Sequence, residues 1–399
     1  MCLITRDKMD SPFTFDKPVT GRNFIGRRPD CNALSNIITH GQNAVIWAPP
    51  KSGKSSLICQ TLFNLRSAGK SFMLCSLPLG NIRTPGAFAR KFAGEVLKAS
   101  AATSDEMSVL AGKYLDGTSL VFDPSYYAET GDVFRGTFPL SDDECMSILE
   151  MPYLISREKG TGIVIVIEEF QNLDSEEGEK LFKCMETVMS AHRDTCDPFC
   201  SWIFEGSGVN AMNGIFRKRH FFWNIVERVE MSQLAVSEIS ESVLKGFSAG
   251  GKVVERELLQ GVCRLFRNNI WYINQFFFIC DSLTRGYISE LTLTDALSCV
   301  TSIHEPGFRR IMDDLTAFQE RLLRAVLDGV VKFSTTEVIE KYALNSSANV
   351  KRLKDALMKK EVICFNDREE PVIMDPLFEY WLRQFYFDKA GVSGAGRWM

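Results

Sequence analysis

The part of this sequence best suited to chemistry is a short loop, Ala48-Pro-Pro-Lys-Ser-Gly-Lys-Ser-Ser56, between an apolar run and a helical pattern. Residues 44–47 predict a buried strand, and the residues from Ser56 onward predict the start of a helix. In this setting a loop can wrap its backbone N–H groups around an anion, helped by the positive end of the helix dipole. The sequence therefore predicts a phosphate-binding loop; the alternative is an ordinary loop that contains Gly-Lys-Ser by chance.

Three residues of this loop suit a nucleoside triphosphate and its metal ion. Gly53 lets the backbone approach a phosphate closely, Lys54 supplies a charge for the β- and γ-phosphates, and Ser55 offers a hydroxyl to Mg²⁺. The usual pattern has Gly where this chain has Ala48. A methyl group at that position need not touch the phosphate, so the change is compatible with binding.

A second apolar run, residues 162–167, ends in two acids, Glu168 and Glu169. Such a run is typical of a strand buried on both faces of a parallel sheet, and its carboxyl end is where ligands bind in open α/β folds. One carboxylate can support Mg²⁺ through water, and the other can polarise an attacking water. The alternative is a pair of surface acids at the end of a strand.

Strands and helices alternate through the first half of the chain, which predicts an α/β fold with a parallel sheet and helices on both faces. Strands are expected at residues 44–47, 71–76, 162–167, 202–204 and 225–231. Helices are expected around 33–38, after the loop, and at 84–97, 151–160 and 175–192. Residues 100–145 are interpreted as an insertion with short helices.

From about Ser237 helical periodicity takes over and predicts a small all-helical domain. Three helices then precede two strands, which is the outline of a winged helix, with Ser334 and Ser346 as the expected caps of its second and third helices. The expected domains are an N-terminal extension (1–20), a P-loop ATPase core (21–232), a helical lid (233–303), a winged helix (304–389) and a tail (390–399).

Composition limits the class of protein. A formal net charge of −4 on 399 residues argues against a wholly basic surface for nucleic acid, though not against a local patch. The 12 cysteines are scattered, as in a cytosolic protein with reduced thiols. His192, Cys196 and Cys200 have helical spacing, but Pro198 interrupts them and a fourth zinc ligand is not evident. Neither a signal peptide nor a run long enough to span a bilayer is expected, so we expect a cytoplasmic protein without a membrane partner.

Four segments occur in an order that resembles AAA+-type P-loop ATPases, and most of all the STAND-like archaeal-ATPase branch that is also widespread in bacteria. They are Phe24-Ile-Gly-Arg27, Ala48–Ser56, Ile167-Glu-Glu-Phe-Gln171 and Phe204-Glu-Gly-Ser207. Asp375-Pro-Leu-Phe-Glu-Tyr-Trp-Leu382 also resembles the C-terminal signature of that family. The resemblance spans about residues 20 to 387, and it implies a lid and a winged helix after the α/β core.

The resemblance implies a role for each matching residue. Glu168 would support the metal together with Ser55, Glu169 would activate the attacking water, and Ser207 would contact the γ-phosphate or that water, unless Ser207 merely forms a turn. The implied catalytic residues are thus Glu169, Lys54 and Ser207. The implied ligands of ATP are Phe24, Ile25, Gly26 and Arg27 beside the adenine, and Ala48, Pro49, Pro50, Lys51, Ser52, Gly53, Lys54, Ser55 and Ser56 around the phosphates.

The chain also departs from the family pattern. Glu168 stands where the family has Asp, which bears on the geometry around Mg²⁺. Asn268-Asn269-Ile270 stands where the family has Gly-x-Pro before Trp271-Tyr272, which bears on contact between lid and nucleotide. Arg217, Lys218 and Arg219 are open to two interpretations, an arginine finger or a solvated charged loop.

These observations together predict a P-loop ATPase that binds ATP and Mg²⁺ and acts as a nucleotide-controlled conformational switch. Two alternatives remain: a winged-helix DNA-binding or regulatory factor in which ATP is structural, and an interaction scaffold deficient in hydrolysis. DNA would contact residues 346–360, where one face carries Lys351, Arg352, Asp355 and Lys359. The opposite face carries the expected core residues Val350, Leu353, Ala356 and Leu357. A protein partner or self-association is expected if that face docks on protein instead.

Overall fold

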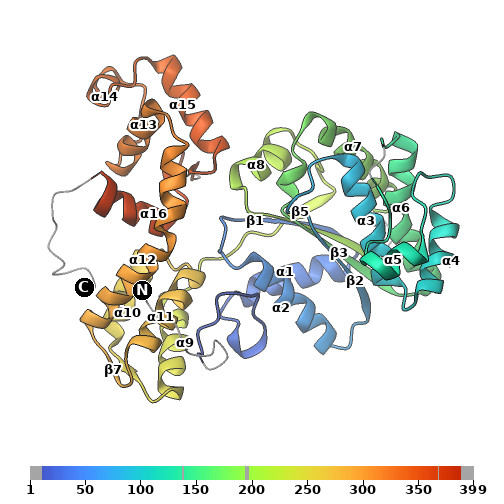
Figure 1. Cartoon of the computed structure of the whole chain (residues 1–399), viewed down its shortest axis with the longest axis horizontal. Coiled ribbons are helices and arrows are strands. Elements are labelled where there is room, and N and C mark those ends of the chain that lie inside the picture. The colour runs from blue at the N-terminus through green and yellow to red at the C-terminus, as the bar shows by residue number, and fades with distance from the viewer. Residues whose placement is uncertain (1–10, 137–138, 194–196, 367, 388–399) are drawn as a thin grey trace. The chain divides into compact units, whose positions relative to one another are not determined.

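The structure is a computed structural model that describes residues 11–136, 139–193, 197–366 and 368–387 (Figure 1). Within these residues the chain forms two compact units, which we describe separately. The sheet unit comprises Arg28–Ala48 and Lys54–Ser232. The helical unit comprises residues 11–27, Pro49–Gly53 and residues 233–387.

The sheet unit is built on a five-stranded sheet with the strand order β2-β3-β4-β1-β5. The strands are β1 (Asn43–Trp47), β2 (Phe72–Pro78), β3 (Gly162–Glu168), β4 (Cys200–Gly206) and β5 (Val226–Arg228). All neighbouring strands run parallel, so the five predicted strands and their parallel arrangement are confirmed. Because β1 and β3 both flank β4, the residues that follow these three strands meet at one edge of the sheet.

Helices cover both faces of this sheet, as predicted. Successive strand residues point to opposite faces, and both sets are buried here, as Trp202, Ile203 and Phe204 of β4 show. On one face the ring of Phe92 stacks on Trp202 with 5.1 Å between ring centroids. The helices that pack beside one another are α1 (Arg28–Thr39) with α2 (Lys54–Ser67), and α3 (Pro85–Ser100) with α6 (Asp142–Lys159) and α7 (Glu176–Ala191).

The predicted helix at Met151-Pro152 starts too late, because α6 has 18 residues and contains Pro152 in its interior. Its start is fixed by a capping box: the Ser141 hydroxyl accepts from the Glu144 N–H, and the Glu144 carboxylate accepts from the Ser141 N–H. Apolar residues on both sides of Pro152 are buried, which offsets the hydrogen bond that a proline removes.

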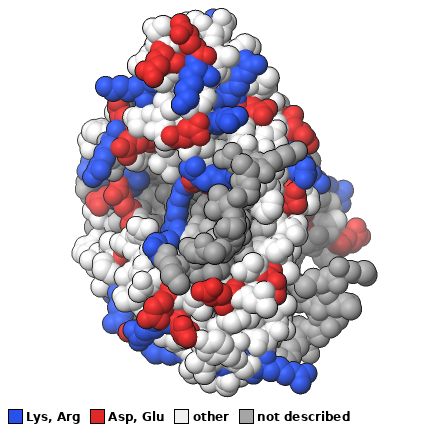
Figure 2. Space-filling view, turned by 90° about the vertical axis from the view of Figure 1, so that its left-hand side faces the viewer, with Lys and Arg blue, Asp and Glu red and all other residues white. Residues whose placement is uncertain are grey.

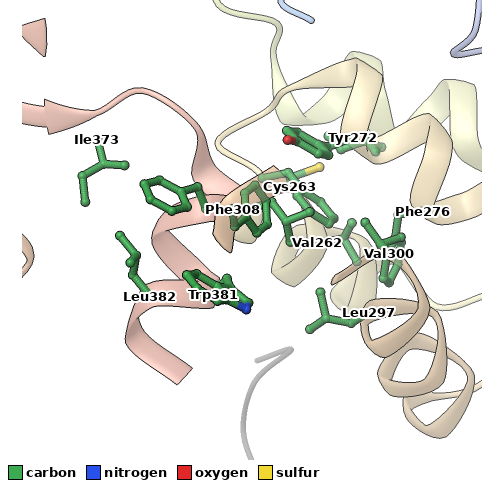
Figure 3. Close-up of a cluster of buried hydrophobic side chains, with 14 of the residues drawn as sticks. Val262, Cys263, Tyr272, Phe276, Leu297, Val300, Phe308, Ile373, Trp381 and Leu382 are labelled. Carbon is green, nitrogen blue, oxygen red and sulfur yellow. The ribbon is translucent and has the colours of Figure 1, made fainter. Parts of the chain in front are cut away.

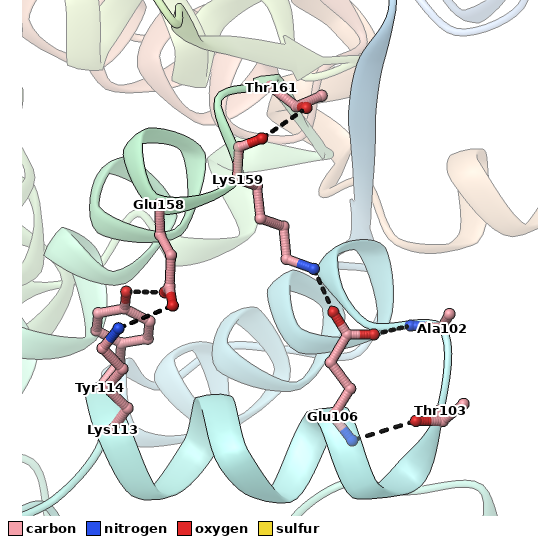
Figure 4. A network of polar contacts seen from close by, with 8 residues as sticks. All are labelled: Ala102, Thr103, Glu106, Lys113, Tyr114, Glu158, Lys159 and Thr161. Carbon is pink, nitrogen blue, oxygen red and sulfur yellow. Dashed lines mark hydrogen bonds and ion pairs between the residues drawn. The ribbon is translucent and has the colours of Figure 1, made fainter.

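The insertion before α6 contains the short helices α4 (Ser104–Tyr114) and α5 (Pro124–Thr130), as expected. Figure 4 shows how α4 is attached to the end of α6: Lys159 pairs with Glu106, and Lys113 pairs with Glu158 at 2.8 Å. These ion pairs lie at the surface, where such contacts fix position more than they add stability.

The helical unit begins with the lid, formed by α9 (Val236–Ala249), α10 (Arg256–Leu265), α11 (Ile270–Leu283) and α12 (Glu290–Asp313). The lid was predicted to be all-helical, but it also contains the two-residue strands β6 (Val253–Val254) and β7 (Tyr287–Ile288), which pair in parallel. The winged helix follows, with α13 (Ala317–Leu327), α14 (Thr336–Lys341), α15 (Ser347–Lys359), the antiparallel strands β8 (Ile363–Phe365) and β9 (Pro371–Ile373), and α16 (Pro376–Trp381). Ser346 caps α15 as predicted, whereas the residue before α14 is Thr335 and not Ser334.

One hydrophobic core serves both the lid and the winged helix (Figure 3). Phe308 of α12 contacts the rings of Phe378 and Trp381 of α16 at 5.3 and 5.8 Å between centroids. The expected boundary at residues 303–304 therefore falls inside α12, and Pro306 does not end that helix. Burial of Val300 on one side and Phe308 on the other outweighs the cost of a proline within a helix.

The remaining short elements are the 3-10 turns Gly21–Asn23 and Phe170–Leu173, the helix α8 (Val209–Asn213), and the π-turns Gly214–Lys218 and Leu382–Tyr386. Among the helices that the structure describes, none has both the length and the apolar character needed to cross a bilayer.

Candidate functional site

The predicted phosphate loop lies between β1, which ends at Trp47, and α2, which begins at Lys54. Two loop residues have positive φ, Lys51 at 65° and Gly53 at 92°. The φ of Gly53 is one that a residue with a side chain rarely adopts, so the loop has a conformational reason for glycine there. The local backbone is therefore the compact turn into a helix N-terminus that anion binding requires.

Lys54 is buried at the start of α2. Its Nζ donates to the carbonyl oxygen of Ala48 at 3.0 Å and lies 3.3 Å from Oε1 of Glu205, and both charged side chains are 5% exposed. Burial raises the pKa of Glu205, Lys54 opposes that rise, and the charges of Glu169 and Glu168 add to it. The ammonium of Lys54, which was predicted to hold phosphate, is thus paired with a carboxylate of the same unit.

Glu205 is a site residue that the sequence reasoning missed. The strand prediction stopped at Phe204, so Glu205 counted as the first residue after a strand, whereas β4 continues to Gly206. Glu205 aligns with Ile46 of β1 and is 3% exposed. A charged residue that directly extends an apolar run was the available signal, because a buried charge requires a partner.

The two acids after β3 have different surroundings. Glu168 is half-buried, and its Oε1 accepts from the Ser76 hydroxyl of β2 at 3.1 Å. Glu169 has a left-handed backbone with φ of 58°, which is uncommon for a residue with a side chain. Such conformations cluster at sites where function fixes the backbone. The structure therefore separates the acids, as separate metal-supporting and water-activating roles would require.

Ser207 lies beside Glu169, which brings together two of the predicted catalytic residues. The Ser207 hydroxyl donates to Oε2 of Glu169 at 2.5 Å, and the Ser207 N–H is 3.4 Å from the same oxygen. The side chain and the backbone N–H of Ser207 thus both address one carboxylate oxygen of Glu169.

Gln171 completes this group, although the sequence analysis gave it no role. Its Nε2 donates to Oε2 of Glu169 at 2.5 Å and lies 3.5 Å from the Ser207 hydroxyl. A Cβ on Gly206 would be 2.7 Å from Oε1 of Gln171, so this glycine makes room for the amide. Gln171 therefore orients the carboxylate of Glu169 from one side while Ser207 does so from another.

The segment Phe24–Arg27, expected beside the adenine, belongs to the helical unit. Arg27 donates from Nη1 to the carbonyl oxygen of Ser52 at 2.8 Å, which connects this segment to the tip of the phosphate loop. Gly26 has φ of 59°, and a Cβ there would be 2.7 Å from Oε2 of Glu238. Ile25 packs on the core of the helical unit, so its contribution is packing.

The departure from Gly-x-Pro in the lid has a local explanation. Ile270, at the place of the family proline, is the first residue of α11, where a proline would be tolerated and is not needed. Asn269 starts the helix by accepting hydrogen bonds from the N–H groups of Trp271 and Tyr272 at 3.0 and 3.2 Å. Helix α11 therefore begins at Ile270 with an asparagine cap and without the proline.

Two of the three candidate arginine-finger residues are engaged within the sheet unit. Arg219 pairs with Asp174 at 2.5 Å and with Glu179 at 2.9 Å, and Arg217 lies 3.4 Å from Glu230. For Arg219 the two carboxylates favour a structural ion pair over an arginine finger.

The zinc alternative depends on Cys196, which lies outside the described residues. The ring of His192 stacks on Tyr153 at 4.1 Å, and its Nε2 is 2.7 Å from a Glu150 oxygen. Cys200 is buried in β4, where burial raises the pKa of its thiol. No cluster of three or more potential metal-binding His, Cys, Asp or Glu side chains occurs in the part of the chain that the structure describes.

The winged helix has the predicted faces. Val350, Leu353 and Leu357 are buried, Ala356 is half-buried, and Lys351, Arg352, Asp355 and Lys359 are exposed. Figure 2 shows basic side chains interspersed with acids. Lys354 lies 4.4 Å above the ring of Phe365, and Lys360 pairs with Asp314. The basic surface of α15 is therefore small.

Comparison with known proteins agrees with this architecture. A family model described as "Probable winged helix domain" matches residues 306–384. The Walker-type ATPase paby2304 of Pyrococcus abyssi superimposes with a TM-score of 0.63 at 14% identity, over 94% of this chain and 100% of that chain. The Aeropyrum pernix ORC2 protein, solved as ADPNP-ADP complexes, gives 0.56 at 11% identity, over 92% and 93%. No curated protein matches the chain.

These similarities show a fold. The chain shares with those proteins a fold in which a parallel sheet with helices is followed by a helical region and a C-terminal winged helix domain. The fold implied by the sequence motifs is thereby confirmed. At these identities the activity of the chain has to be argued from its own residues.

Proposed function

We propose that this protein binds ATP with Mg²⁺ at the phosphate loop, hydrolyses it, and uses the cycle as a conformational switch. The observation that carries the proposal is the group formed by Glu169, Ser207 and Gln171 at the edge of the sheet where the loop that precedes Lys54 also begins. Solved neighbours with this fold include an ATPase and a protein crystallised with ADPNP and ADP, which supports an adenine nucleotide as the ligand.

The chain's own residues divide the work. The backbone N–H groups of Lys51, Ser52 and Gly53 and the Lys54 ammonium hold the phosphates. Phe24 to Arg27 border the base. Glu169 accepts a proton from the attacking water, with Ser207 and Gln171 fixing the orientation of its carboxylate.

The donor set fits Mg²⁺, because the Ser55 hydroxyl and the Glu168 carboxylate are the hard oxygen ligands that this ion takes. When bound, Mg²⁺ would neutralise charge on the β- and γ-phosphates. Glu168 is held in place for this by its hydrogen bond from Ser76.

The test combines binding and turnover. A fluorescent ATP analogue measures affinity, and phosphate release measures the rate. Glu169→Gln should still bind the analogue and should slow hydrolysis by roughly 10²- to 10⁴-fold, because the proton acceptor is lost. Lys54→Ala should weaken binding by about tenfold or more, because a charge-assisted hydrogen bond to phosphate disappears.

The matched control is Glu177→Gln, an exposed carboxylate in the first turn of α7, which should change neither quantity. Equal affinity in wild type and Lys54→Ala would refute the phosphate-loop assignment. Turnover that is absent in wild type would favour the hydrolysis-deficient scaffold, and turnover unchanged in Glu169→Gln would remove Glu169 from the reaction.

The DNA-factor alternative rests on one observation, the exposed Lys351, Arg352 and Lys359 of α15. The exposed Asp355 belongs to the same helix, and Glu337, Glu340 and Glu361 belong to the same domain, which weakens long-range attraction to a polyanion. We therefore favour a protein partner or self-association for this face, and the salt-dependence experiment described in the Discussion separates the two.

A further inference from the structure

Lys51, at the tip of the phosphate loop, is held by the lid. Its Nζ lies 4.2 Å from the centre of the Trp271 ring and 4.7 Å from that of Tyr272, and it donates to the Tyr272 hydroxyl at 3.3 Å. All three residues belong to the helical unit. The contact is thus a cation over two aromatic faces, with a hydrogen bond added.

The same tyrosine is held by the winged helix. The Tyr272 hydroxyl donates to Oδ2 of Asp375 at 2.6 Å. The other oxygen, Oδ1, caps α16 by accepting from the N–H groups of Leu377 and Phe378 at 2.9 and 3.1 Å. Asp375 therefore accepts a hydrogen bond from the lid with one oxygen and caps a helix of the winged-helix domain with the other.

Burial and charge act in opposite directions on the ammonium at the start of this chain of contacts. Burial lowers the pKa of Lys51, and the charge of Asp375 acts in the opposite direction. A carboxylate that polarises the Tyr272 hydroxyl makes its oxygen a better acceptor for the ammonium. Lys51, Tyr272 and Asp375 form one continuous chain of polar contacts, which we name the loop–wing link.

The position of Lys51 makes this link relevant to phosphate. It lies two residues before Gly53 and three before Lys54, and it has the left-handed φ of 65°. A triphosphate bound in the loop attracts every nearby cation, while the link directs this ammonium toward Tyr272. The loop–wing link and a phosphate therefore compete for Lys51 and for the backbone around it.

We propose that Tyr272 and Asp375 are positioning residues for the phosphate loop: they hold its tip through Lys51, and nucleotide phosphates release that hold. The inference rests on the proposed function and adds the route by which bound nucleotide reaches the winged helix. Coupling between two binding events is reciprocal, so the free energy by which the link weakens nucleotide binding equals the free energy by which bound nucleotide weakens the link. If the loop is free in about one molecule in ten, removing the link tightens nucleotide binding by about tenfold.

The experiment uses Tyr272→Phe, which removes the hydroxyl and keeps the ring that stacks on Phe266 at 5.6 Å. Its matched control is Tyr342→Phe, because the Tyr342 hydroxyl also donates to a carboxylate, Asp328 at 2.7 Å, within the winged helix. We expect Tyr272→Phe to bind the Mg·ATP analogue about tenfold more tightly than wild type, and Tyr342→Phe to bind it as wild type does.

A second variant and a second measurement guard against loss of folding. Asp375→Asn keeps an oxygen for the α16 cap and removes the charge, so it should shift affinity in the same direction by a smaller factor. Hydrogen exchange of residues 371–381 should rise in wild type when the analogue is added. In Tyr272→Phe the same residues should exchange faster without nucleotide and respond little to it.

The outcomes separate the two proposals. Wild-type protein that does not bind the analogue refutes the proposed function and the role of the link with it. Wild-type binding with unchanged affinity in Tyr272→Phe refutes the link alone. Weaker binding in Tyr272→Phe with normal thermal stability also overturns it, because the link would then support the loop in its binding conformation.

Discussion

Replacing Glu205 by Gln tests the arrangement at the phosphate loop most directly. The carboxylate lies 3.3 Å from the Lys54 ammonium. A phosphate oxygen bound about 3 Å beyond that ammonium would be roughly 6 Å from Glu205. With an effective dielectric constant of about 20, two unit charges at this distance repel by about 3 kcal/mol, or on the order of 100-fold in affinity.

Relaxation and solvent reduce that upper value, so we expect Glu205→Gln to tighten binding of the ATP analogue by about ten- to 100-fold. The same change leaves a buried ammonium without its countercharge, so the melting temperature should fall without nucleotide and recover with it. Titration and thermal unfolding check both effects, with Glu227→Gln on the exposed edge strand β5 as the control. Unchanged or weaker binding in a folded Glu205→Gln variant would refute the idea that Glu205 competes with phosphate.

Two further predictions concern the helical unit. Burial lowers the pKa of His304 to about 4, and its Nε2 lies 2.8 Å from Oε1 of Gln275. Since His304 is protonated at a higher pH in the unfolded chain, its contribution to stability is present above about pH 6.5 and is lost as pH falls toward 4. His304→Gln should therefore flatten the decline in melting temperature between pH 7 and 5. Parallel curves of melting temperature against pH for the two proteins would contradict this. For the winged helix we expect no DNA complex with a dissociation constant below about 10⁻⁶ M at physiological salt, measured by titration across salt concentrations. A steep dependence of log affinity on log salt concentration, with a slope that decreases by about two units in Lys351→Ala/Arg352→Ala, would show instead that α15 contacts phosphate.

The sequence was sufficient for the architecture because the signals are local. Continuous apolar runs located the strands, the capping residues Thr84, Ser175 and Ser346 located three helix starts, and the loop of Gly53 and Lys54 marked the turn between β1 and α2. Errors arose where a local rule met tertiary packing. Pro152 was predicted to lie at the start of a helix, and Pro306 to lie at a domain boundary. Both prolines lie inside longer helices, where the buried residues on either side keep the helix intact.

The candidate site was predictable in its motif and less so in its contacts. Glu169 and Ser207 were chosen individually, but their 2.5 Å contact joins residues after different strands and depends on the strand order. The partners of Lys51 are more remote still: Tyr272 is 221 residues away along the chain. No periodicity in the sequence indicates such a convergence, because it depends on how the lid helices pack.

The common core of lid and winged helix has a mechanical consequence. Helix α12 contains 24 residues and is packed into that core from Leu293 to Met312, so at 1.5 Å per residue it is a stiff rod of about 36 Å. Close-packed interiors do not bend continuously, so both ends of the rod move together. A rotation of about 10° at its first turn displaces its last turn by about 6 Å, which is more than one helical turn. A small tilt of the lid therefore moves the winged helix through a large translation, and the length of α12 alone produces this amplification.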